Sequence, residues 1–436
     1  MMLSHSSLYA GLQELILSDY LYIDKSRRLF ELLCELENAP RFAAPNIYLL
    51  IRPRGFGLSL AAGAIEKLTS RDRGILDKLS LTEEFKELPI HHVITLDFKN
   101  FNAQTPREFA DELIERIQKL YWNQHIESHI SPYQSPKGYF ANLIAAVSKR
   151  YQEPAVIVID NYDLPFMVAA EMPCAYQNEA IAFYLDMLNA IKHAGDSVSW
   201  CLLTGHIKFS LASEISEGLP FVNDISNDPR FETLFGLTYD EVQILFNEKI
   251  ATIARDFSIS PDDYMKALMS CYGGFCFSDN LINVMCPACI SHAMANYGAL
   301  YPYSATGDYR YLKNIFAKTE PNLKWLFDKD GQDPLHTWSV AMDPCGKEIG
   351  ALLIQSGFVS RNKVTVHNYD AYTTWRYRFD YPNEDMRRSL LVVSGKVAPE
   401  LAYRPFTPEE LLEIDETQRF LDGEDVYELL KEEEEL

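Results

Sequence analysis

The stretch Ile47-Tyr-Leu-Leu-Ile-Arg-Pro-Arg-Gly-Phe-Gly-Leu-Ser-Leu60 decides the fold. It begins with an apolar run, continues through a loop that contains glycine, and ends in a segment rich in Ala and Leu that favours a helix. A strand that leads through a tight loop into a helix is the arrangement in which backbone N–H groups and the helix dipole bind phosphate. We therefore predict a phosphate-binding loop over residues 52–60.

This loop departs from the pattern G-x-x-x-x-G-K-[ST]. Gly57 and Ser59 match the second glycine and the hydroxyl residue, but Leu58 stands at the phosphate-binding lysine. The first glycine position is also changed, to arginine. The candidate nucleotide-binding residues of the loop are Arg52, Arg54, Gly55, Gly57, Leu58, Ser59 and Leu60. The alternative is a relic turn, in which the glycines serve backbone geometry alone and Leu58 packs where a cation should reach phosphate.

Helical and strand patterns alternate around this loop. Amphipathic helical stretches occupy the first 45 residues, and further helices are predicted over 58–68, 105–120, 140–151 and 177–193. Strands are predicted over 89–97, 154–160 and 198–205, and in the second of these Val and Ile run without polar interruption up to Asp160. Such continuous runs are typical of parallel strands that are buried on both faces. The pattern predicts an α/β fold, a P-loop NTPase-like parallel sheet with helices on both faces.

Polar residues end two of these strands, at the place where parallel sheets bind ligands. Asp160 is the candidate Mg²⁺ ligand together with Ser59. Thr204 is a candidate phosphate sensor, although a local backbone hydrogen bond is the more ordinary role of such a hydroxyl. Asn161 stands beside Asp160, where a working ATPase commonly has a carboxylate that orients water. The predicted cofactor is ATP or another nucleotide with Mg²⁺.

The order of these motifs resembles the bacterial AAA-ATPase-like family, whose P-loop NTPases are often fused to a PD-(D/E)XK nuclease-like domain. The matching segments are Asp24-Lys-Ser26, Arg52–Leu60, Ile159–Asp163, Leu203–Gly205, Asn223-Asp224, Phe235–Val242, Tyr272–Ser278, Gln355–Phe358 and Tyr381–Arg387. The resemblance implies an ATPase site with degenerate Walker A and B motifs. We expect the nuclease-like domain to be absent, since only about 45 residues follow the last of these segments.

We expect four parts in the chain. They are an AAA-like P-loop NTPase domain with N-terminal helices over residues 1–235, a helical lid-like domain over 236–320, a C-terminal α/β domain over 321–410 and an acidic tail over 411–436. Helices are predicted over 261–268 and 277–297. The chain has neither an export signal at its start nor an apolar run of the roughly 18–20 residues that a membrane-spanning helix needs. We therefore expect a cytoplasmic protein with no membrane insertion.

The net charge of −22, from 62 acidic and 40 basic residues, argues against a nucleic-acid-binding surface over the whole molecule. It leaves a local basic groove open. The run Glu432–Glu435 resembles the glutamate-rich signals of effectors that type IV secretion systems translocate into host cells. Cys286 and Cys289 have the spacing of zinc ligands, but we expect buried thiols, because the resembled family has Asn-Pro where this chain has Cys286-Pro287.

Loss of the lysine and of the second carboxylate predicts a degenerate ATPase that acts by interacting with another macromolecule. We expect this macromolecule to be a protein partner. One lost charged hydrogen bond costs roughly 1.5–3 kcal/mol, which weakens nucleotide binding without abolishing it. Two alternatives stay open. One is an active ATPase in which Arg52, Arg54 or Lys25 replaces the missing lysine. The other is a nucleic-acid-binding remnant of a mobile-element protein.

Overall fold

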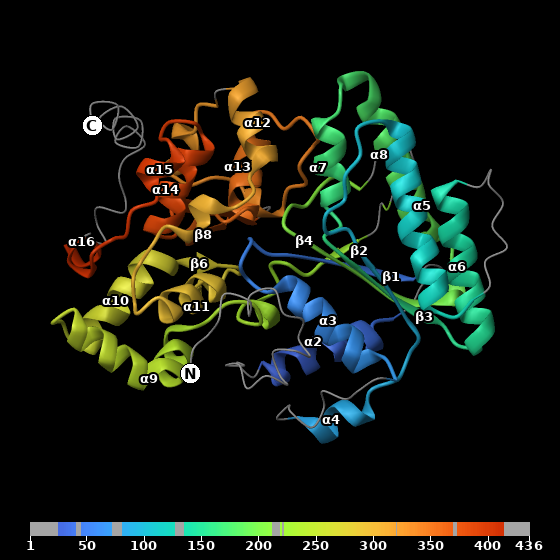
Figure 1. Ribbon diagram of the computed structural model, residues 1–436, viewed down its shortest axis with the longest axis horizontal. Helices are drawn as coiled ribbons and strands as arrows, with labels where there is room; N and C mark the ends of the chain where they lie inside the picture. The colour runs from blue at the N-terminus through green and yellow to red at the C-terminus, as the bar shows by residue number, and fades with distance from the viewer. Residues whose placement is uncertain are drawn as a thin grey trace. The chain divides into compact units, whose positions relative to one another are not determined.

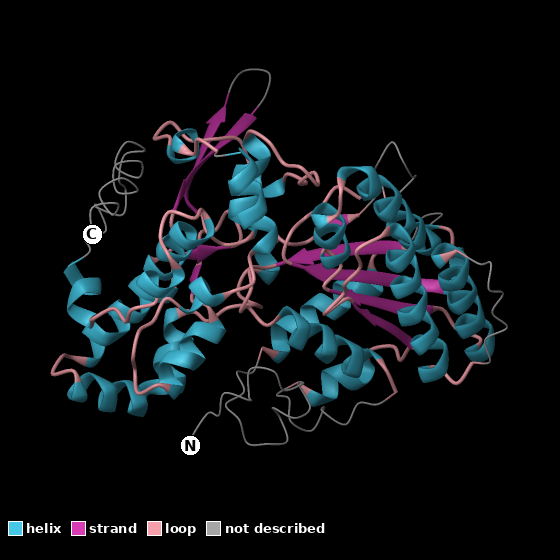
Figure 2. Ribbon diagram, turned by 45° about the horizontal axis from the view of Figure 1, so that its top comes forward, coloured by secondary structure: helices cyan, strands magenta, loops and turns pink. Residues whose placement is uncertain are grey.

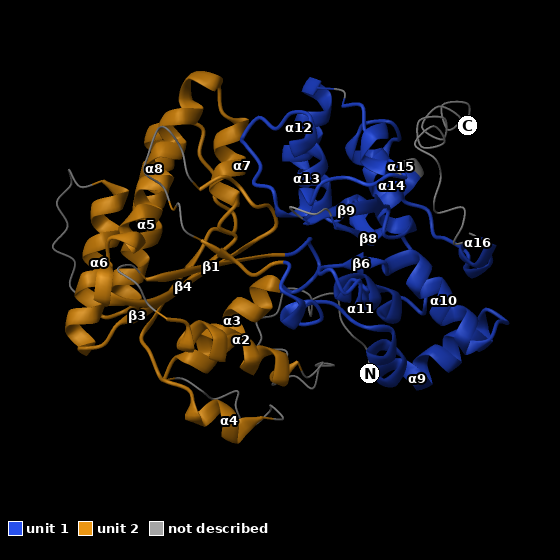
Figure 3. Cartoon of the chain, turned by 180° about the vertical axis from the view of Figure 1, so that it is seen from behind, with its two compact units in different colours: residues 1–9, 52–57, 227–436 blue, residues 10–51, 58–226 orange. Residues whose placement is uncertain are grey.

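The computed structural model describes residues 25–40, 45–71, 81–126, 135–211, 219, 222–319, 321–368 and 373–413. The chain divides into two compact units (Figure 3). Unit 1 contains Arg52–Gly57 and the chain from Asn227 onward, and unit 2 contains Ala10–Ile51 and Leu58–Ser226. The chain therefore leaves unit 2 within the predicted phosphate-binding loop and then returns to it.

Unit 2 is built on a five-stranded parallel sheet with the strand order β2-β3-β4-β1-β5. Its strands are β1 (Asn46–Ile51), β2 (Val93–Asp97), β3 (Ala155–Asp160), β4 (Val198–Gly205) and β5 (Asn223–Asp224). Strands β3 and β4 are buried along their whole length, as expected of central parallel strands rich in apolar residues. The predicted α/β fold with a parallel sheet is confirmed.

Helices cover both faces of this sheet (Figure 1). On one face lie α5 (Pro106–Asn123), α6 (Pro136–Tyr151) and α8 (Cys174–Lys192), which contact one another, and on the other lie α2 (Ser26–Asn38) and α3 (Leu58–Thr69). Shorter elements are α4 (Thr82–Glu87), α7 (Leu164–Glu171) and η3 (Gly195–Ser197). Thr105 caps the N-terminus of α5, because its Oγ1 atom accepts a hydrogen bond from Glu108 N at 3.2 Å.

The register of the sheet places the polar strand ends together. Asp97 of β2 lies opposite Asp160 of β3, and Ile159 lies opposite Leu203, so Thr204 follows beside Asp160. Ile51 at the end of β1 lies opposite Gly205. All four strands therefore end at one edge of the sheet.

Unit 1 combines helices with two short antiparallel hairpins. Its helices are α9 (Tyr239–Asp256), α10 (Pro261–Tyr272), α11 (Pro287–Ala295), α12 (Arg310–Thr319), α13 (Lys347–Gln355), α14 (Glu384–Val393), α15 (Pro399–Ala402) and α16 (Pro408–Glu413). Its 3₁₀ turns are η4 (Pro229–Phe231), η5 (Tyr303–Thr306), η6 (Lys324–Phe327) and η7 (Leu335–Thr337). The hairpins are β6 (Phe275–Cys276) with β7 (Asn283–Val284), and β8 (Ser360–Asn368) with β9 (Thr373–Asp380). Figure 2 shows the second hairpin as a two-stranded ribbon.

One predicted helix, over residues 277–297, is wrong in its first half. That half contains β7, and the helix begins only at Pro287. A turn replaces it because Ser278 Oγ accepts a hydrogen bond from Asn280 N at 3.1 Å and Leu281 adopts a φ of 56°. The helix predicted over 261–268 lies within α10. The N-terminal stretch before Lys25 and most of the acidic tail lie outside the described residues.

Candidate functional site

Five polar residues meet at the carboxyl edge of the unit 2 sheet, and we call them the edge cluster: Ser59, Asp97, Asp160, Asn161 and Thr204. Ser59 lies in the first turn of α3, Asp97 ends β2, and Asp160 ends β3. Asn161 follows β3 directly, and Thr204 lies near the end of β4. The cluster joins three of the predicted site residues, Ser59, Asp160 and Thr204, to one another.

Asp160 is the centre of the edge cluster and is 5% exposed. Its Oδ1 atom accepts hydrogen bonds from Thr204 Oγ1 at 2.7 Å and from Asn161 N at 2.9 Å. Burial raises the pKa of Asp160, hydrogen bonds from Ser59 and Thr204 lower it, and the charge of Asp97 raises it further; the outcome is a raised pKa. A cation at this edge would stabilise the ionised form.

Asn161 links the two carboxylates of the cluster. Its Nδ2 atom donates to Asp97 Oδ1 at 2.8 Å and to Asp160 Oδ2 at 3.2 Å. Its φ of 54° lies in the left-handed region, which Asn tolerates better than most residues. A carboxylate at this position would have no hydrogen to donate and would add a third negative charge. The amide therefore bridges the two carboxylates by hydrogen bonds, at a position where an ATPase commonly has a water-orienting acid.

Asp97 is a member of the cluster that the sequence analysis did not select. Besides the bond from Asn161, its Oδ1 atom accepts one from Lys99 N at 2.8 Å. Arg116 of α5 donates to Asp97 O and, at 3.1 Å, to Lys99 O, which holds the loop after β2. The signal was present in the sequence, because Asp97 ends a predicted strand in the same way as Asp160.

The donors of the edge cluster suit Mg²⁺. Carboxylate and hydroxyl oxygens are hard ligands, and Mg²⁺ usually binds one or two carboxylates together with phosphate oxygens and water. The side chain of Ser59 is hydrogen-bonded to Asp160 and the residue is exposed to solvent. Among the described residues, no group of three or more His, Cys, Asp or Glu side chains could hold a metal ion by itself. The cluster therefore fits a cation that is shared with a phosphate.

Leu58 occupies the position of the phosphate-binding lysine and is buried, with 4% of its surface exposed. It is the first residue of α3. Gly57 before it has a φ of 81°, a conformation that favours glycine, and Leu60 after it is half-buried. The chain thus retains a glycine turn and a helix start, with an apolar side chain in place of the cation.

Arg52 packs within unit 1. Its side chain is 1% exposed, and its guanidinium lies 4.3 Å from the ring centre of Phe277 and 5.5 Å from that of Phe235. Its Nη2 atom donates to Phe231 O at 3.2 Å. Cation–π contacts of a desolvated arginine are worth up to about 2 kcal/mol. The geometry gives Arg52 a packing role.

The rest of the Arg52–Gly57 segment also packs in unit 1. The ring centre of Phe56 lies 4.9 Å from that of Phe275. Gly55 O accepts from Ala288 N at 3.2 Å, and a Cβ at Gly55 would lie 2.8 Å from Cys286 Sγ. Arg54, in contrast, is exposed. A hydrogen bond from Arg310 lowers the pKa of Asp308, and the positive charge of Arg54 adds to the effect.

Asp163 has a structural role behind the edge cluster. Its side chain is fully buried, and Oδ2 accepts hydrogen bonds from His206 N at 2.8 Å and from Ile207 N at 3.0 Å. The hydroxyl of Tyr162 donates to Ile207 O at 2.8 Å. These bonds fix the loop after β4, and with it the end of the strand that carries Thr204.

Cys286 and Cys289, the pair with zinc spacing, are both buried at the start of α11. Cys289 Sγ lies 3.5 Å from Asp385 Oδ2, a hydrogen-bonding contact. A hydrogen bond with Cys286, followed by burial, raises the pKa of the Cys289 thiol. A raised pKa disfavours the thiolate that binds metals.

The glycine loop, the strand order and the acidic strand end lie in one continuous region of the sequence. Residues 10–215 match the AAA-ATPase-like family. The model of this family is described as a predicted AAA-ATPase, and the match bears out the resemblance of the motifs that lie within these residues. The AAA-ATPase-like segment contains β1 to β4 and the whole edge cluster.

A relative from Azotobacter chroococcum mcd 1 is 25% identical over 238 residues, and is described as an uncharacterized protein in the vnfD 5′ region. The match covers 55% of this chain and 43% of the relative, so the chain spans less than half of that protein's length.

Two solved structures from Aeropyrum pernix also align with this chain. The ORC1 protein in complex with DNA is 12% identical, covering 87% of this chain and 96% of its own, with a TM-score of 0.31. The ORC2 protein with ADPNP and ADP is 10% identical, covering 88% and 97%, with a TM-score of 0.35. The DNA and the nucleotides are properties of those two proteins. Among the described residues, no helix is both long and apolar enough to cross a membrane.

Proposed function

We propose that the AAA-ATPase-like segment binds a nucleotide with Mg²⁺ at the edge cluster, that it hydrolyses this nucleotide poorly or not at all, and that the protein acts by binding another macromolecule. The family match supports an ATPase-like ancestry of the site. The oxygen donors of Ser59 and Asp160 support retention of Mg²⁺.

The observation that carries this proposal is the amide of Asn161 between Asp97 and Asp160. Hydrolysis needs a group that orients the attacking water, and in P-loop enzymes a residue near the metal supplies it. The amide of Asn161 is instead committed as a donor to two carboxylates. It cannot accept a proton, so the chemical step loses its base while the metal ligands keep their positions.

The buried Leu58 supports the same proposal. Loss of a charged partner costs roughly 1.5–3 kcal/mol of binding free energy, which corresponds to a dissociation constant about 10- to 150-fold larger. Loss of a preorganised donor to transition-state charge costs roughly a further 2.7–4 kcal/mol in the chemical step. Binding is therefore impaired less than turnover.

The contribution of each remaining residue follows from its contacts. The Ser59 hydroxyl and the Asp160 carboxylate would hold the Mg²⁺ ion, and Thr204 would hold Asp160 in place. The bound metal ion would neutralise charge on the phosphate oxygens. Gly57 keeps the turn at the start of α3, where helix N–H groups favour an anion.

An active ATPase that uses a substitute arginine has less support. Arg52 would have to leave its contacts with Phe277, Phe235 and Phe231 O before it could reach a phosphate. Arg54 is exposed and has no such constraint, so it is the stronger substitute of the two.

The test is calorimetric titration of the purified full chain with ATP and with ADP in the presence of Mg²⁺, together with measurement of phosphate release. We expect binding that is lost in Asp160→Ala and that needs Mg²⁺, with phosphate release equal to the buffer blank. Turnover that is abolished by Asp160→Ala would overturn the loss of hydrolysis. No heat of binding for either nucleotide would overturn the binding itself.

A further inference from the structure

The ribbon formed by β8 and β9 has two chemically different faces. Residues opposite one another in an antiparallel pair share a face, and successive residues alternate between faces. The register pairs Lys363 with Arg378, and Thr365 with Arg376. One face, which we call the basic face, therefore carries Lys363, Thr365, His367, Thr374, Arg376 and Arg378. The other carries Val364, Val366, Trp375 and Tyr377.

The apolar face is covered at the base of the ribbon and uncovered toward its end. Tyr377 is 4% exposed, whereas Val366 is 50% and Trp375 47% exposed, although these last two pair directly. The far half of the ribbon thus extends beyond the core of unit 1 with both faces open (Figure 2). An element of this kind can enter a groove on the surface of a partner.

The basic face concentrates positive charge in a chain whose net charge is −22. Lys363 and Arg376 are exposed, and Arg378 is half-buried beside them. Asp333 interacts with two of the nearby cations. Its Oδ2 atom accepts a hydrogen bond from Lys347 Nζ at 2.9 Å, and its Oδ1 atom lies 4.0 Å from Arg376 Nη1. This adds Lys347 of α13 to the patch, where Lys347 and Arg376 share one carboxylate. Such a local excess attracts polyanions despite the overall charge.

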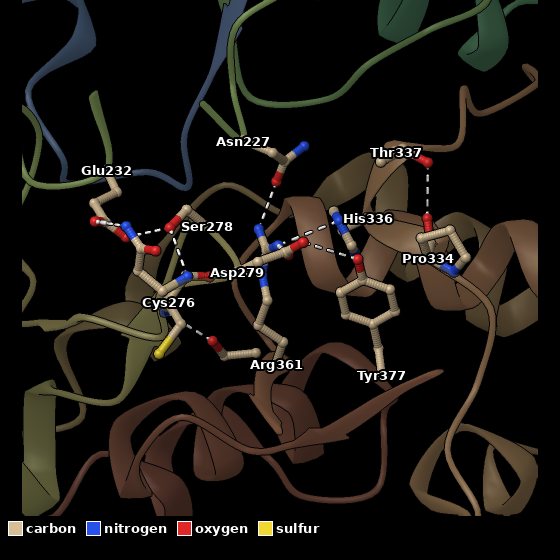
Figure 4. A network of polar contacts seen from close by, with 12 residues as sticks. Asn227, Glu232, Cys276, Ser278, Asp279, Pro334, His336, Thr337, Arg361 and Tyr377 are labelled. Atoms are coloured by element: carbon tan, nitrogen blue, oxygen red, sulfur yellow. Dashed lines mark hydrogen bonds and ion pairs between the residues drawn. The ribbon is translucent and has the colours of Figure 1, made fainter. Parts of the chain in front are cut away.

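The base of the ribbon is held firmly, which positions these cations. Arg361 of β8 is 3% exposed and donates to Asp279 Oδ1 at 2.9 Å, to Asn227 Oδ1 at 2.5 Å and to Cys276 O at 3.2 Å (Figure 4). Tyr377 of β9 donates its hydroxyl to Asp279 Oδ2 at 3.1 Å. The network ties both strands to the β6–β7 loop, so little ordering entropy is lost when a ligand binds the ribbon.

We propose that the basic face of the β8–β9 ribbon binds the sugar–phosphate backbone of duplex DNA, with the ribbon lying in the major groove. A major groove about 12 Å wide admits a two-stranded ribbon, and long basic side chains on the inward face can reach the phosphates along its rims. This names the macromolecule that the proposed function leaves open, and in that respect it rests on the proposed function.

Two other anionic partners fit the geometry less well. A lipid surface needs apolar and basic side chains that enter the same interface. Here Val366 and Trp375 lie on the face opposite Lys363 and Arg376. The major groove of duplex RNA is too deep and narrow for side chains to read. Duplex DNA is the partner whose major groove admits the ribbon with its basic face turned inward.

The expected signature is salt dependence. Each phosphate that a Lys or Arg neutralises contributes about 0.9 to the slope of log K against log salt. Three contacts, from Lys363, Arg376 and Arg378, therefore predict about a 40-fold loss of affinity between about 50 and 200 mM salt. This loss of DNA affinity with rising salt should depend on these three residues.

The experiment is fluorescence anisotropy of the full chain with a labelled duplex of mixed sequence, titrated across that salt range. The test variant is Lys363→Gln with Arg376→Gln and Arg378→Gln. The matched control, Arg27→Gln with Arg107→Gln and Lys119→Gln, makes the same charge change on exposed helix surfaces of unit 2. We expect the control to bind like the wild type and the test variant to lose most of the affinity and of the salt slope.

Equal binding by the test variant and the wild type would overturn the proposal, as would equal loss in the control. Binding of heparin or duplex RNA as tight as that of DNA would also overturn it, because the patch would then be a general polyanion site. Nucleotide titration of the same samples separates the two proposals. If DNA does not bind while Mg²⁺-ATP does, only the DNA proposal fails.

Discussion

Asn161 donates hydrogens to two carboxylates, and its amide sets the charge of the edge cluster. An amide at position 161 donates hydrogen bonds to Asp97 and Asp160, whereas a carboxylate of nearly the same size would repel both. Leu58 is a second such position, buried at the start of α3 where a cation would meet phosphate. Single changes at these residues test whether the cluster is a disabled site.

Asn161→Asp should destabilise the protein more at high pH than at low pH. The pKa of Asp160 is already raised, first by burial and also by the charge of Asp97. A third carboxyl would raise the pKa of Asp160 further, so the stability that its bound proton gives is present at low pH and lost as the pH rises through the folded pKa. Urea unfolding at pH 5 and pH 8 measures this, with a loss of about 1–3 kcal/mol at the higher pH.

Asn161→Ala is the control, because it removes the donor without adding a third carboxyl. Its loss of stability should also grow with pH, because the amide stabilises the ionised carboxylates, but by less than the loss in Asn161→Asp. A pH-independent loss in Asn161→Asp would contradict the bridging role of the amide. Mg²⁺ should restore part of the stability of Asn161→Asp, since the cation would replace the amide between the carboxylates.

Leu58→Lys combined with Asn161→Glu should raise phosphate release above that of the wild type. The two changes return the missing cation and the missing acid to their positions, and each is worth roughly a factor of 10–100 or more in rate. Steady-state phosphate release with Mg²⁺-ATP is the measurement. Adding Asp160→Ala to the double variant is the control and should remove the gain. Rates at the blank level in a folded double variant would show that the defect lies elsewhere.

At the scale of elements, strands and helices are held by a few buried polar groups. Asp385 in the first turn of α14 accepts hydrogen bonds from Ser304 N at 2.9 Å and from Ser304 Oγ at 2.6 Å, which ties α14 to η5. Arg361 does the same for β8 through the network described above. The stability of these contacts can be measured one element at a time.

Asp385 should make unit 1 less stable as the pH rises from about 4 to 7. Burial raises its pKa to about 6 despite the hydrogen bonds from Ser304. The folded state holds the proton of Asp385 more tightly than the unfolded state does. The stability that this proton contributes is therefore fully present below the unfolded pKa and is lost as the pH rises through the folded pKa. The full loss is about 3 kcal/mol. Urea unfolding of the wild type and of Asp385→Asn should differ in this pH slope, and parallel profiles would contradict it.

Arg361→Met should lower the free energy of unfolding by about 3–5 kcal/mol, because removing one member of a buried charged network leaves the others unpaired. Arg376→Met is the matched control on the same ribbon and should change stability by less than about 0.5 kcal/mol, as is usual at exposed sites. Urea unfolding followed by circular dichroism is the measurement. Similar losses in the two variants would contradict the anchoring role of Arg361.

The elements that the sequence predicts well are those with long, uniform patterns. The strand predicted from the Val/Ile run and the helix predicted over 105–120 are both found, as β3 and α5. The error over residues 277–297 arose because Ser278 and Asn280 form a turn inside an apolar stretch. Asp160 and Thr204 could be selected because each ends a strand. Asp97 became a partner of Asp160 only through the pairing of β2 with β3, which no local pattern reveals.

The contacts of Arg52 could not be predicted for the same reason. Its partners Phe235 and Phe277 are distant in sequence, and a family motif that usually contains arginine gives no sign that this one packs on aromatic rings. The four-part division of the chain stays a prediction, alongside the two units that the structure has.

At the scale of the whole molecule, ligand binding should appear as stabilisation. A nucleotide that binds only the folded state adds RT ln(1 + [L]/Kd), about 2.7 kcal/mol at a hundredfold excess over Kd. Thermal unfolding with increasing Mg²⁺-ATP should show a Tm that rises with the logarithm of the ATP concentration. Asp160→Ala should show no rise, and a rise of equal size in that variant would place the nucleotide elsewhere.

The passage of Arg52–Gly57 through unit 1 limits how this protein can be divided for expression. A fragment ending at Ser226 would keep Arg52 and Phe56 but lose Phe231, Phe235, Phe275 and Phe277, the residues against which they pack. Its solubility would suffer from an aromatic ring exposed on a glycine loop. The complementary fragment from Asn227 would lack the inserted segment. A soluble version of either half therefore requires redesign of these six residues. The first fragment needs polar substitution of its exposed residues, and the fragment from Asn227 needs a tethered peptide that supplies Arg52–Gly57.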